Sequence, residues 1–258
     1  MVSDRHGMNI LGLLQARVSS SRLPGKVLKP ILGKPMLLRQ IERVRRARSL
    51  DHLVVATSTD PSDDAIEELC ASAGIDCFRG SLEDVLDRFY QAALRFTPQH
   101  IVRLTGDCPL ADPELIDRVV AFYLTGGFDD AGNAVEATFP DGLDVEVVRF
   151  AVLEQAWKEA RRPFDREHVT MFVHAHPERF RVGSYEHPVN LSHLRWTVDE
   201  AEDFELVTEI YEALYPQNPE FTTADVLDLL AKRPELSDSN HRIQRFEGVR
   251  RLVARVSP

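Results

Sequence analysis

Residues 9–26 have the sequence NILGLLQARVSSSRLPGK. The first part, 9–16, is an apolar run typical of a strand that is buried on both faces. The second part, 17–26, carries two arginines, one lysine, three serines and Gly25. Such a loop after a buried strand is suited to a triphosphate, because its cations neutralise charge while its hydroxyl and N–H groups donate hydrogen bonds. The alternative is a solvated basic loop without a ligand.

Strand and helix patterns alternate over the first half of the chain. After the strand at 9–16, the predicted strands are 52–58, 76–79 and 101–105, and the predicted helices are 36–48, 63–73, 82–96 and 113–124. Four strand–helix units in succession predict an α/β fold with a doubly wound, mostly parallel sheet. Ligands of such sheets bind beyond the carboxyl ends of the strands, so the candidate site lies in the loops that follow them.

The alternation changes after Gly126. Predicted strands then cover 144–150, 180–185 and 194–198, and predicted helices cover 153–161, 166–174, 200–215 and 223–231. No repeat or linker interrupts the chain, so we expect one domain over 8–245, preceded by a polar tail at 1–7. Within it, 135–188 is a smaller insertion whose apolar strands have no obvious room in the parallel sheet. Uncovered strand edges and apolar patches favour a partner subunit, and we expect a homodimer.

Composition excludes several classes of protein. The formal net charge of −10 argues against a general nucleic-acid or membrane-surface binder. The sequence contains no run of about 20 apolar residues that would span a membrane. No secretory signal pattern is present, and the three cysteines have no metal-binding spacing and make a disulfide framework improbable. We therefore expect a cytoplasmic protein.

The basic loop also carries a family resemblance. Its pattern R-x-x-S-x-R-L-P-G-K, followed by GKPM at 33–36, resembles the opening of the CMP-sugar synthetases, which include CMP-KDO synthetase, acylneuraminate cytidylyltransferase and the spore-coat polysaccharide type. The resemblance implies a nucleotide-diphospho-sugar transferase-like fold in which this segment binds CTP. Sugar-1-phosphate nucleotidyltransferases have a glycine-rich start instead. The expected nucleotide-binding residues are Leu14, Ala16, Arg17, Ser20, Arg22, Lys26, Ser81, Arg103 and Gly106, with Arg22 and Lys26 also catalytic.

An aspartate follows another predicted strand. Residues 103–110 read RLTGDCPL, which places Asp107 at the strand's end. A carboxylate that faces a triphosphate is a natural Mg²⁺ ligand, because this ion prefers oxygen donors. Helix capping is the alternative role, but Asp112 before Pro113 is better placed for it. The segment resembles the family's G-D-x-P-L motif, which implies that Asp107 is catalytic and binds the metal.

A second carboxylate completes the expected metal site. Residues 195–203, RWTVDEAED, end a predicted strand and begin a helix. Asp199 matches the second metal aspartate of the family, so the resemblance implies Mg²⁺ held by Asp107 and Asp199. The alternative is that Asp199 is only the N-cap of the helix. Glu202 and Asp203 are interpreted as first-turn acids without a chemical role.

The sugar side is expected in the second half of the chain. Residues 139–147 read FPDGLDVEV, and Asp144 and Glu146 share one face of the predicted strand, which suits hydrogen bonds to sugar hydroxyls. This stretch, REHVT at 166–170 and NHRIQR at 240–245 resemble the spore-coat type. A packing role is the alternative for the histidine of REHVT. The expected sugar-binding residues are Lys34, Asn133, Asp144, Glu146 and His168.

Charge and resemblance together predict a Mg²⁺-dependent cytidylyltransferase. It would couple CMP from CTP to a sugar, a 3-deoxy-ulosonic acid or a related surface-polysaccharide sugar, and release pyrophosphate. The alternatives are a sugar-phosphate nucleotidyltransferase that uses another nucleotide and a catalytically silent nucleotide-binding module. A glycosyltransferase would need a D-x-D motif, which the GDCP segment does not supply. The resemblance further implies a two-fold dimer formed through the 135–188 region, in which the partner reaches toward the sugar site.

Overall fold

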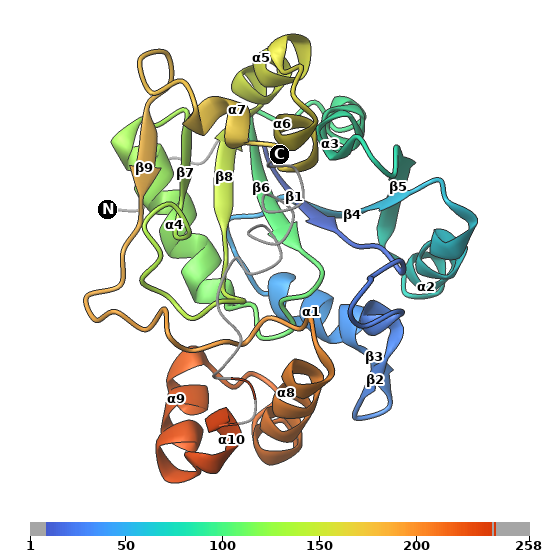
Figure 1. Ribbon diagram of the computed structural model, residues 1–258, viewed down its shortest axis with the longest axis vertical. Helices are drawn as coiled ribbons and strands as arrows, with labels where there is room; N and C mark the ends of the chain where they lie inside the picture. Colours follow the sequence, from blue (N-terminus) through green and yellow to red (C-terminus); the bar gives the residue numbers. More distant parts are fainter. Residues whose placement is uncertain (1–8, 239, 241–258) are drawn as a thin grey trace, which may run out of the picture.

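A single seven-stranded sheet organises the protein (Figure 1). The computed structural model describes residues 9–238 and 240. The sheet has the order β5-β4-β1-β6-β8-β7-β9. The strands are β1 (Ile10–Gln15), β4 (His52–Ser58), β5 (Asp76–Gly80), β6 (His100–Thr105), β7 (Asp130–Gly132), β8 (Glu146–Arg149) and β9 (Val182–Ser184). Only β8 runs antiparallel to its neighbours, so the predicted mostly parallel sheet is confirmed.

Strand β1 lies in the middle of the parallel part because both of its faces are apolar. Ile10 and Leu14 enter one hydrophobic cluster, whereas Leu11 and Leu13 enter the other. This division follows from the alternation of side chains along a strand. The strand pairs in parallel with β4 on one side and β6 on the other, which places its carboxyl end between two other strand ends.

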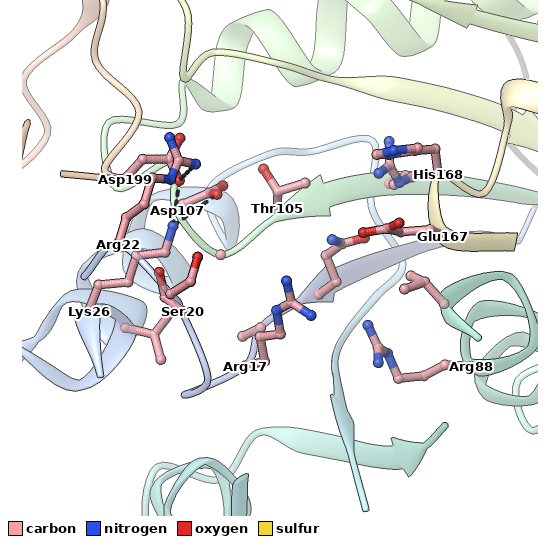
Figure 2. Close-up of a pocket in the computed structure, with 17 residues that line it drawn as sticks. Arg17, Ser20, Arg22, Lys26, Arg88, Thr105, Asp107, Glu167, His168 and Asp199 are labelled. Atoms are coloured by element: carbon pink, nitrogen blue, oxygen red, sulfur yellow. Dashed lines mark hydrogen bonds and ion pairs between the residues drawn. The ribbon is translucent and has the colours of Figure 1, made fainter. Parts of the chain in front are cut away.

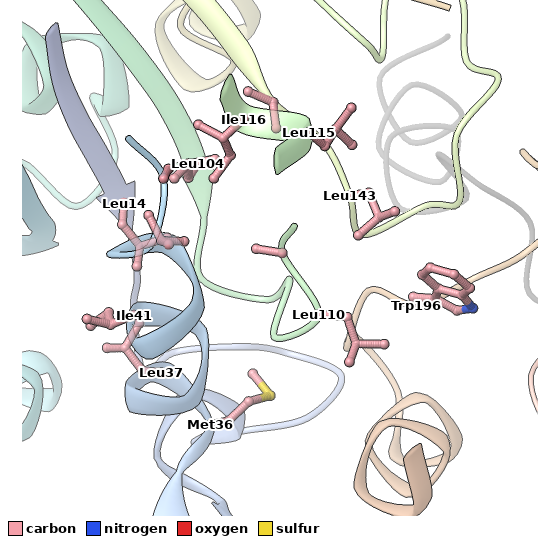
Figure 3. Packing of buried hydrophobic residues seen from close by; sticks show 14 of the residues in the cluster. Leu14, Met36, Leu37, Ile41, Leu104, Leu110, Leu115, Ile116, Leu143 and Trp196 are labelled. Carbon is pink, nitrogen blue, oxygen red and sulfur yellow. The ribbon is translucent and has the colours of Figure 1, made fainter. Parts of the chain in front are cut away.

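Helices cover both faces of the sheet. The structure has helices α1 (Met36–Val44), α2 (Asp64–Ser72), α3 (Val85–Leu94), α4 (Pro113–Gly126), α5 (Phe150–Glu159), α6 (Pro163–Glu167), α7 (Met171–His174), α8 (Ala201–Leu214), α9 (Thr223–Lys232) and α10 (Glu235–Asp238). Helices α1, α2 and α4 pack on one face, and α3, α5 and α7 pack on the other. Figure 3 shows the first of these cores, where Leu14 and Leu104 of the sheet meet Leu37 and Ile41 of α1.

Helices α8, α9 and α10 form a group of their own at the lower end of the molecule (Figure 1). Leu206, Ile210 and Val226 extend the first core into this group. Short elements complete the fold: the 3-10 helices η1 (Lys26–Leu28) and η2 (Pro61–Asp63), and a hairpin of β2 (Pro30–Ile31) and β3 (Lys34–Pro35). Among the described residues, no helix is long and apolar enough to cross a membrane.

Two predicted elements were wrong in the second half of the chain. The helix expected at 166–174 is broken between α6 and α7, where Val169 has a left-handed backbone with φ 59°. The strand expected at 194–198 is an irregular segment with one isolated bridge, Asp141 to Arg195, because its N–H groups at 196 and 197 bond to a loop carbonyl. The short strand β7 and the terminal helix α10 were not predicted.

The expected insertion at 135–188 is part of the main sheet. Strand β8 lies between β6 and β7, and β9 forms the edge beside β7. The expectation that its strands have no room in the sheet is therefore wrong. The expectation did not consider that the antiparallel strand β8 can pair with β6 and extend the sheet, so that β7 pairs with β8 and β9 with β7. The predicted dimer stays a prediction.

Candidate active site

A pocket of about 270 Å³ opens beyond the carboxyl ends of β1 and β6 (Figure 2). This is the edge where the loops of a parallel sheet bind ligands. The loop after β1, the loop after β6, α3, the end of α6 and the segment before α8 all contribute to it. Its lining is Gln15, Ala16, Arg17, Ser20, Ser21, Arg22, Lys26, Val27, Val85, Arg88, Arg103, Thr105, Gly106, Asp107, Glu167, His168 and Asp199.

The basic loop is held in place by a buried carboxylate. Asp63 is fully buried and accepts hydrogen bonds from the backbone N–H of Val18 at 2.7 Å and of Ser58 at 3.2 Å. It therefore ties the start of the loop to the end of β4. Farther along, Gly25 has φ 70°, a conformation that favours glycine, and its N–H bonds to the carbonyl of Val18 at 3.0 Å. This turn brings Lys26 into the pocket.

Lys26 joins the two predicted metal aspartates. Its Nζ donates to Asp107 Oδ2 at 3.2 Å, to Asp199 Oδ1 at 2.9 Å and to the carbonyl of Val198 at 2.7 Å. Arg22 adds a second cation, with Nη2 3.0 Å from Asp199 Oδ1. The structure thus brings together four residues that the sequence assigned to one site. We call Arg22, Lys26, Asp107 and Asp199 the aspartate end of the pocket.

These contacts fix the charges at the aspartate end. Burial disfavours the ammonium of Lys26, but the carboxylates of Asp107 and Asp199 outweigh it and raise the pKa of Lys26. Burial likewise opposes ionisation of Asp107, yet Lys26 and a hydrogen bond from Thr105 lower the pKa of Asp107 to about 2. An opposite charge within about 4 Å has this effect on both partners. The carboxylate is therefore ionised near neutral pH.

Close backbone packing places Asp107 beside Asp199. A Cβ on Gly106 would lie 2.9 Å from the carbonyl oxygen of Gln15, so glycine allows the end of β6 to approach the end of β1. On the other side, the N–H of Val198 bonds to the carbonyl of Asp107 at 2.8 Å. The two aspartates therefore belong to segments that are hydrogen-bonded to each other.

Asp199 is not the N-cap of α8. That position belongs to Glu200, which forms a capping box with Asp203. Asp203, which the sequence had left without a chemical role, is fully buried and binds Arg195 at 2.9 Å. Arg195 also binds Asp199 Oδ2 at 3.1 Å and Asp141 at 3.0 Å. Arg195 was missed by sequence reasoning. It binds the Asp199 oxygen that does not contact Lys26, and so it fixes the orientation of this carboxylate.

The C-terminal motif at 240–245 falls mostly outside the described residues. Asn240 is described and buried, and its amide donates to the carbonyl of Arg195 and to Asp203 Oδ1, both at 2.9 Å. It therefore supports the aspartate end through Arg195.

The opposite end of the pocket carries Arg17, Arg88, Arg103 and His168, which we call the arginine end. Arg17 makes no hydrogen bond or ion pair with another described residue. Arg88 is buried, and its Nη1 donates to the carbonyl of Ser81 at 2.6 Å. Burial, followed by repulsion from Arg17, lowers the pKa of Arg88 to about 10. Within the described chain, the Nε atoms of Arg88 and Arg103 are buried without a hydrogen-bond partner.

Such an accumulation of cations is unfavourable without a counter-charge. Arg103 has one in Glu146, at 3.1 Å, and the carboxylate of Glu167 also lines the pocket. Burial, partly offset by Glu167, lowers the pKa of His168. Arg88 was missed in the sequence because an arginine on a helix is usually solvated. The side chain of Arg17 and the Nε atoms of Arg88 and Arg103 are suited to bind an anionic or hydrogen-bond-accepting ligand.

Six predicted site residues do not line this pocket. Leu14 and Asn133 are fully buried, and the amide of Asn133 bonds to the backbone at 143 and 145. Lys34 is exposed and pairs with Glu42 at 2.5 Å. Ser81 caps the turn before α3 and gives its carbonyl to Arg88. The remaining two are Asp144, which precedes β8, and Glu146, which contacts the pocket through Arg103. Their ligand-binding roles stay predictions.

The donor set at the aspartate end fits a divalent cation. Two carboxylate oxygens and a carbonyl oxygen already converge on one positive group, the ammonium of Lys26. Oxygen donors of this kind are those that Mg²⁺ and Mn²⁺ prefer. A second group with metal-binding side chains, Asp130, Glu146 and His174, lies behind the arginine end, with ligand atoms within 4.8 Å of one another.

Comparison with known proteins agrees with this geometry. The profile of the family described as Cytidylyltransferase matches residues 11–237. The chain is 38% identical to an uncharacterized protein of Methanocaldococcus jannaschii over 92% of this chain and 96% of that protein. It is 34% identical to the spore coat polysaccharide biosynthesis protein SpsF of Bacillus subtilis, over 88% and 96%. A cytidylyltransferase structure from Leptospira borgpetersenii superposes with a TM-score of 0.85 at 32% identity, covering 89% of this chain and 97% of that one.

Fold and site therefore define a nucleotidyltransferase-like α/β protein with a basic loop and two neighbouring aspartates at the carboxyl edge of its sheet. The chain belongs to the cytidylyltransferase family.

Proposed function

We propose that the protein transfers CMP from CTP to a sugar and releases pyrophosphate. The observation that carries this proposal is the contact of Lys26, the last residue of the basic loop, with both Asp107 and Asp199. Family membership supports the cytidylyl group, and the similarity to a spore coat polysaccharide biosynthesis protein supports a sugar acceptor. The acceptor we favour is a 3-deoxy-ulosonic acid or a related surface-polysaccharide sugar.

The reaction is an in-line displacement at phosphorus. A hydroxyl oxygen of the sugar forms a bond to the α-phosphorus, the bond from that phosphorus to the bridging oxygen breaks, and pyrophosphate leaves. The hydroxyl proton passes to solvent. Arg17, Arg22 and Lys26 neutralise the bound triphosphate, and Arg22 and Lys26 stabilise the charge that develops on the leaving group. No covalent enzyme intermediate is required.

Asp107 and Asp199 would hold Mg²⁺, which would supply charge neutralisation and alignment of the phosphate oxygens when bound. Arg195 fixes the second of these carboxylates through Asp199 Oδ2. The ionised state of Asp107 near neutral pH keeps its oxygens available as ligands.

We also propose a homodimer in which the 135–188 segment meets its partner near the sugar side. The short strand β9 forms a sheet edge there, and Val135 and Phe164 are exposed apolar side chains of the segment. Light scattering after size exclusion tests this proposal. A mass near 58 kDa, about twice the 29.2 kDa of one chain, is expected, and the mass of one chain would reject it.

Pyrophosphate release from the four common nucleoside triphosphates, each with a panel of 3-deoxy-ulosonic acids and sugar phosphates, tests the function. We expect release with CTP and one acceptor class. A pocket that hydrogen-bonds cytosine leaves groups unpaired with uracil, at about 1–3 kcal/mol each. Preference for another nucleotide with a sugar phosphate would favour the sugar-phosphate nucleotidyltransferase. Nucleotide binding without release under any condition would favour a silent module.

A further inference from the structure

A series of polar side chains runs from the pocket wall into the protein. Arg103 Nη1 donates to Glu146 Oε2 at 3.1 Å. Thr170 Oγ1 donates to Glu146 Oε1 at 2.7 Å, and His174 Nε2 lies 3.6 Å from this same oxygen. The imidazole also lies 2.8 Å from Asp130 Oδ1. The series thus connects a residue of the arginine end with a fully buried carboxylate of β7.

The buried end of this series holds a proton near neutral pH. A buried charge is costly unless it is paired. Burial, followed by repulsion from Glu146, raises the pKa of Asp130 to about 7, although His174 opposes the shift. Burial opposes the imidazolium, yet Asp130 and Glu146 raise the pKa of His174. A proton held between Asp130 and His174 reduces the repulsion between the buried Asp130 side chain and Glu146.

A strained junction links this series to the pocket. Val169 is buried, β-branched and left-handed, with φ 59°, and the N–H of Thr170 bonds to the carbonyl of His168 at 2.6 Å. Such a conformation is costly for a β-branched residue and persists only where the surroundings enforce it. The junction separates His168 at the pocket from His174 on α7. The positions of His168 and His174 therefore both depend on the backbone conformation at Val169.

We propose that His174 is a positioning residue for the pocket. Together with Asp130 it fixes the carboxylate of Glu146, and Glu146 holds the guanidinium of Arg103 against the bound substrate. This inference rests on the proposed function only in that the pocket binds the substrates of the transfer. The side chains of Asp130, Glu146 and His174 could also bind a metal ion. The hydrogen-bonded arrangement is favoured because Glu146 already accepts from Arg103 and Thr170.

A double-mutant cycle tests the inference. His174→Gln is expected to raise the KM of one substrate about 10-fold with kcat within about threefold, the pattern of lost ground-state binding. His176→Gln is the matched control, because His176 is a nearby histidine that bonds to the carbonyl of Phe172 and lies outside the series. In an Arg103→Gln background, His174→Gln is expected to have no further effect. Full additivity of the two losses would overturn the inference.

A second readout does not depend on activity. In spectra of protein labelled with ¹⁵N-arginine, the Nε–H signal of Arg103 is assigned by its loss in Arg103→Gln. We expect this signal to shift or broaden in His174→Gln but not in His176→Gln, and an unchanged signal would contradict the inference. If the wild type releases no pyrophosphate, the proposed function fails while this readout still decides the positioning role.

Equilibrium dialysis against Zn²⁺ and Mn²⁺ distinguishes the metal alternative. We expect His174→Gln to leave the metal stoichiometry of the protein unchanged. One equivalent of metal that is lost in His174→Gln and retained in His176→Gln would make the group a metal site and overturn the positioning role.

Discussion

The two ends of the pocket differ in how their cationic side chains are neutralised (Figure 2). At the aspartate end, Lys26 and Arg22 are neutralised by the carboxylates of Asp107 and Asp199, so the charges are fixed before any ligand arrives. At the arginine end, Arg17 has no ion pair with a described residue and repels Arg88, whereas Arg103 is paired with Glu146. The cations of the first end are paired with carboxylates of the protein, whereas Arg17 and Arg88 of the second end form no ion pair with a described residue.

The same contrast appears in the pKa values of two carboxylates, the partly buried Asp107 and the fully buried Asp130. At Asp107 burial is outweighed by Lys26 and by hydrogen bonds, and the pKa falls to about 2. At Asp130 burial and repulsion from Glu146 prevail, and the pKa rises to about 7. Electrostatic preorganisation is worth most where charge develops in the transition state. We therefore expect substitutions at the aspartate end to lower kcat and substitutions at the arginine end to raise KM.

The largest effect is expected at the aspartate end. Asp107→Asn should lower kcat about 1000-fold, or about 4 kcal/mol in activation free energy, because it removes an ionised oxygen donor. Asp199→Asn should act in the same direction. Glu202→Gln is the control, since Glu202 is an exposed acid of the first turn of α8. Steady-state kinetics measure the effect on kcat, and circular dichroism checks that each variant is folded. A variant with activity within about tenfold of wild type would show that the substituted aspartate does not belong to the metal site.

The next effect is expected at the arginine end. Arg17→Gln should raise the KM for CTP about 10- to 100-fold, because a charge-assisted hydrogen bond is worth about 1.5–3 kcal/mol. The value of kcat should stay within about threefold, since the cations of the aspartate end remain. Arg118→Gln provides the comparison, because Arg118 is an exposed arginine on α4 that pairs with Glu114. A fall in kcat with an unchanged KM would break the distinction between the two ends.

A smaller effect is expected in the pH dependence of stability. The folded-state pKa of Asp130 is raised from 3.8 to about 7, and that of His174 is also raised. A raised pKa contributes stability that is present below the unfolded-state pKa and is lost as pH rises through the folded-state value. The melting temperature of wild type minus that of Asp130→Asn should therefore fall by about 2 °C or more between about pH 5 and pH 9. A constant or rising difference would show that Asp130 does not titrate in this range.

The smallest effect is expected at the rim of the aspartate end. Arg22 Nη1 lies 3.5 Å from Glu200 Oε1, and both side chains are partly exposed. Exposed ion pairs contribute about 0–1 kcal/mol. Glu200→Gln should therefore change kcat/KM by less than about threefold. A larger loss of kcat/KM, measured in the same assay as Asp107→Asn, would show that Glu200 also contributes to the aspartate end.

Sequence reasoning could place the basic loop and Asp107 because their signals are local, whereas Asp199 was predicted from the family resemblance. The apolar run at 9–16 predicted a buried strand, and the position of Asp107 after another strand predicted that it lies at the carboxyl edge of a parallel sheet. The basic loop is contiguous in the sequence, so its charges could be assigned to one place. These features depend on neighbouring residues and on a general property of parallel sheets.

The parts that the sequence did not predict depend on distant partners. Arg195 is buried because Asp141, 54 positions earlier, and Asp203 neutralise it. Strand β7 has only three residues and forms through its pairing with β8 and β9. The break at Val169 is enforced by its surroundings, since a β-branched residue alone disfavours positive φ. Such features emerge only when the tertiary arrangement is known.

The central claim is that the pocket transfers the cytidylyl group and expels pyrophosphate. The most direct measurement is mass spectrometry of a reaction that contains CTP, Mg²⁺ and an accepted sugar acid, with pyrophosphate quantified in the same sample. The account predicts a product with the mass of the acceptor plus CMP less one water, formed in equal amount to pyrophosphate. Formation of CDP and inorganic phosphate, or of free CMP with the acceptor unchanged, would contradict it.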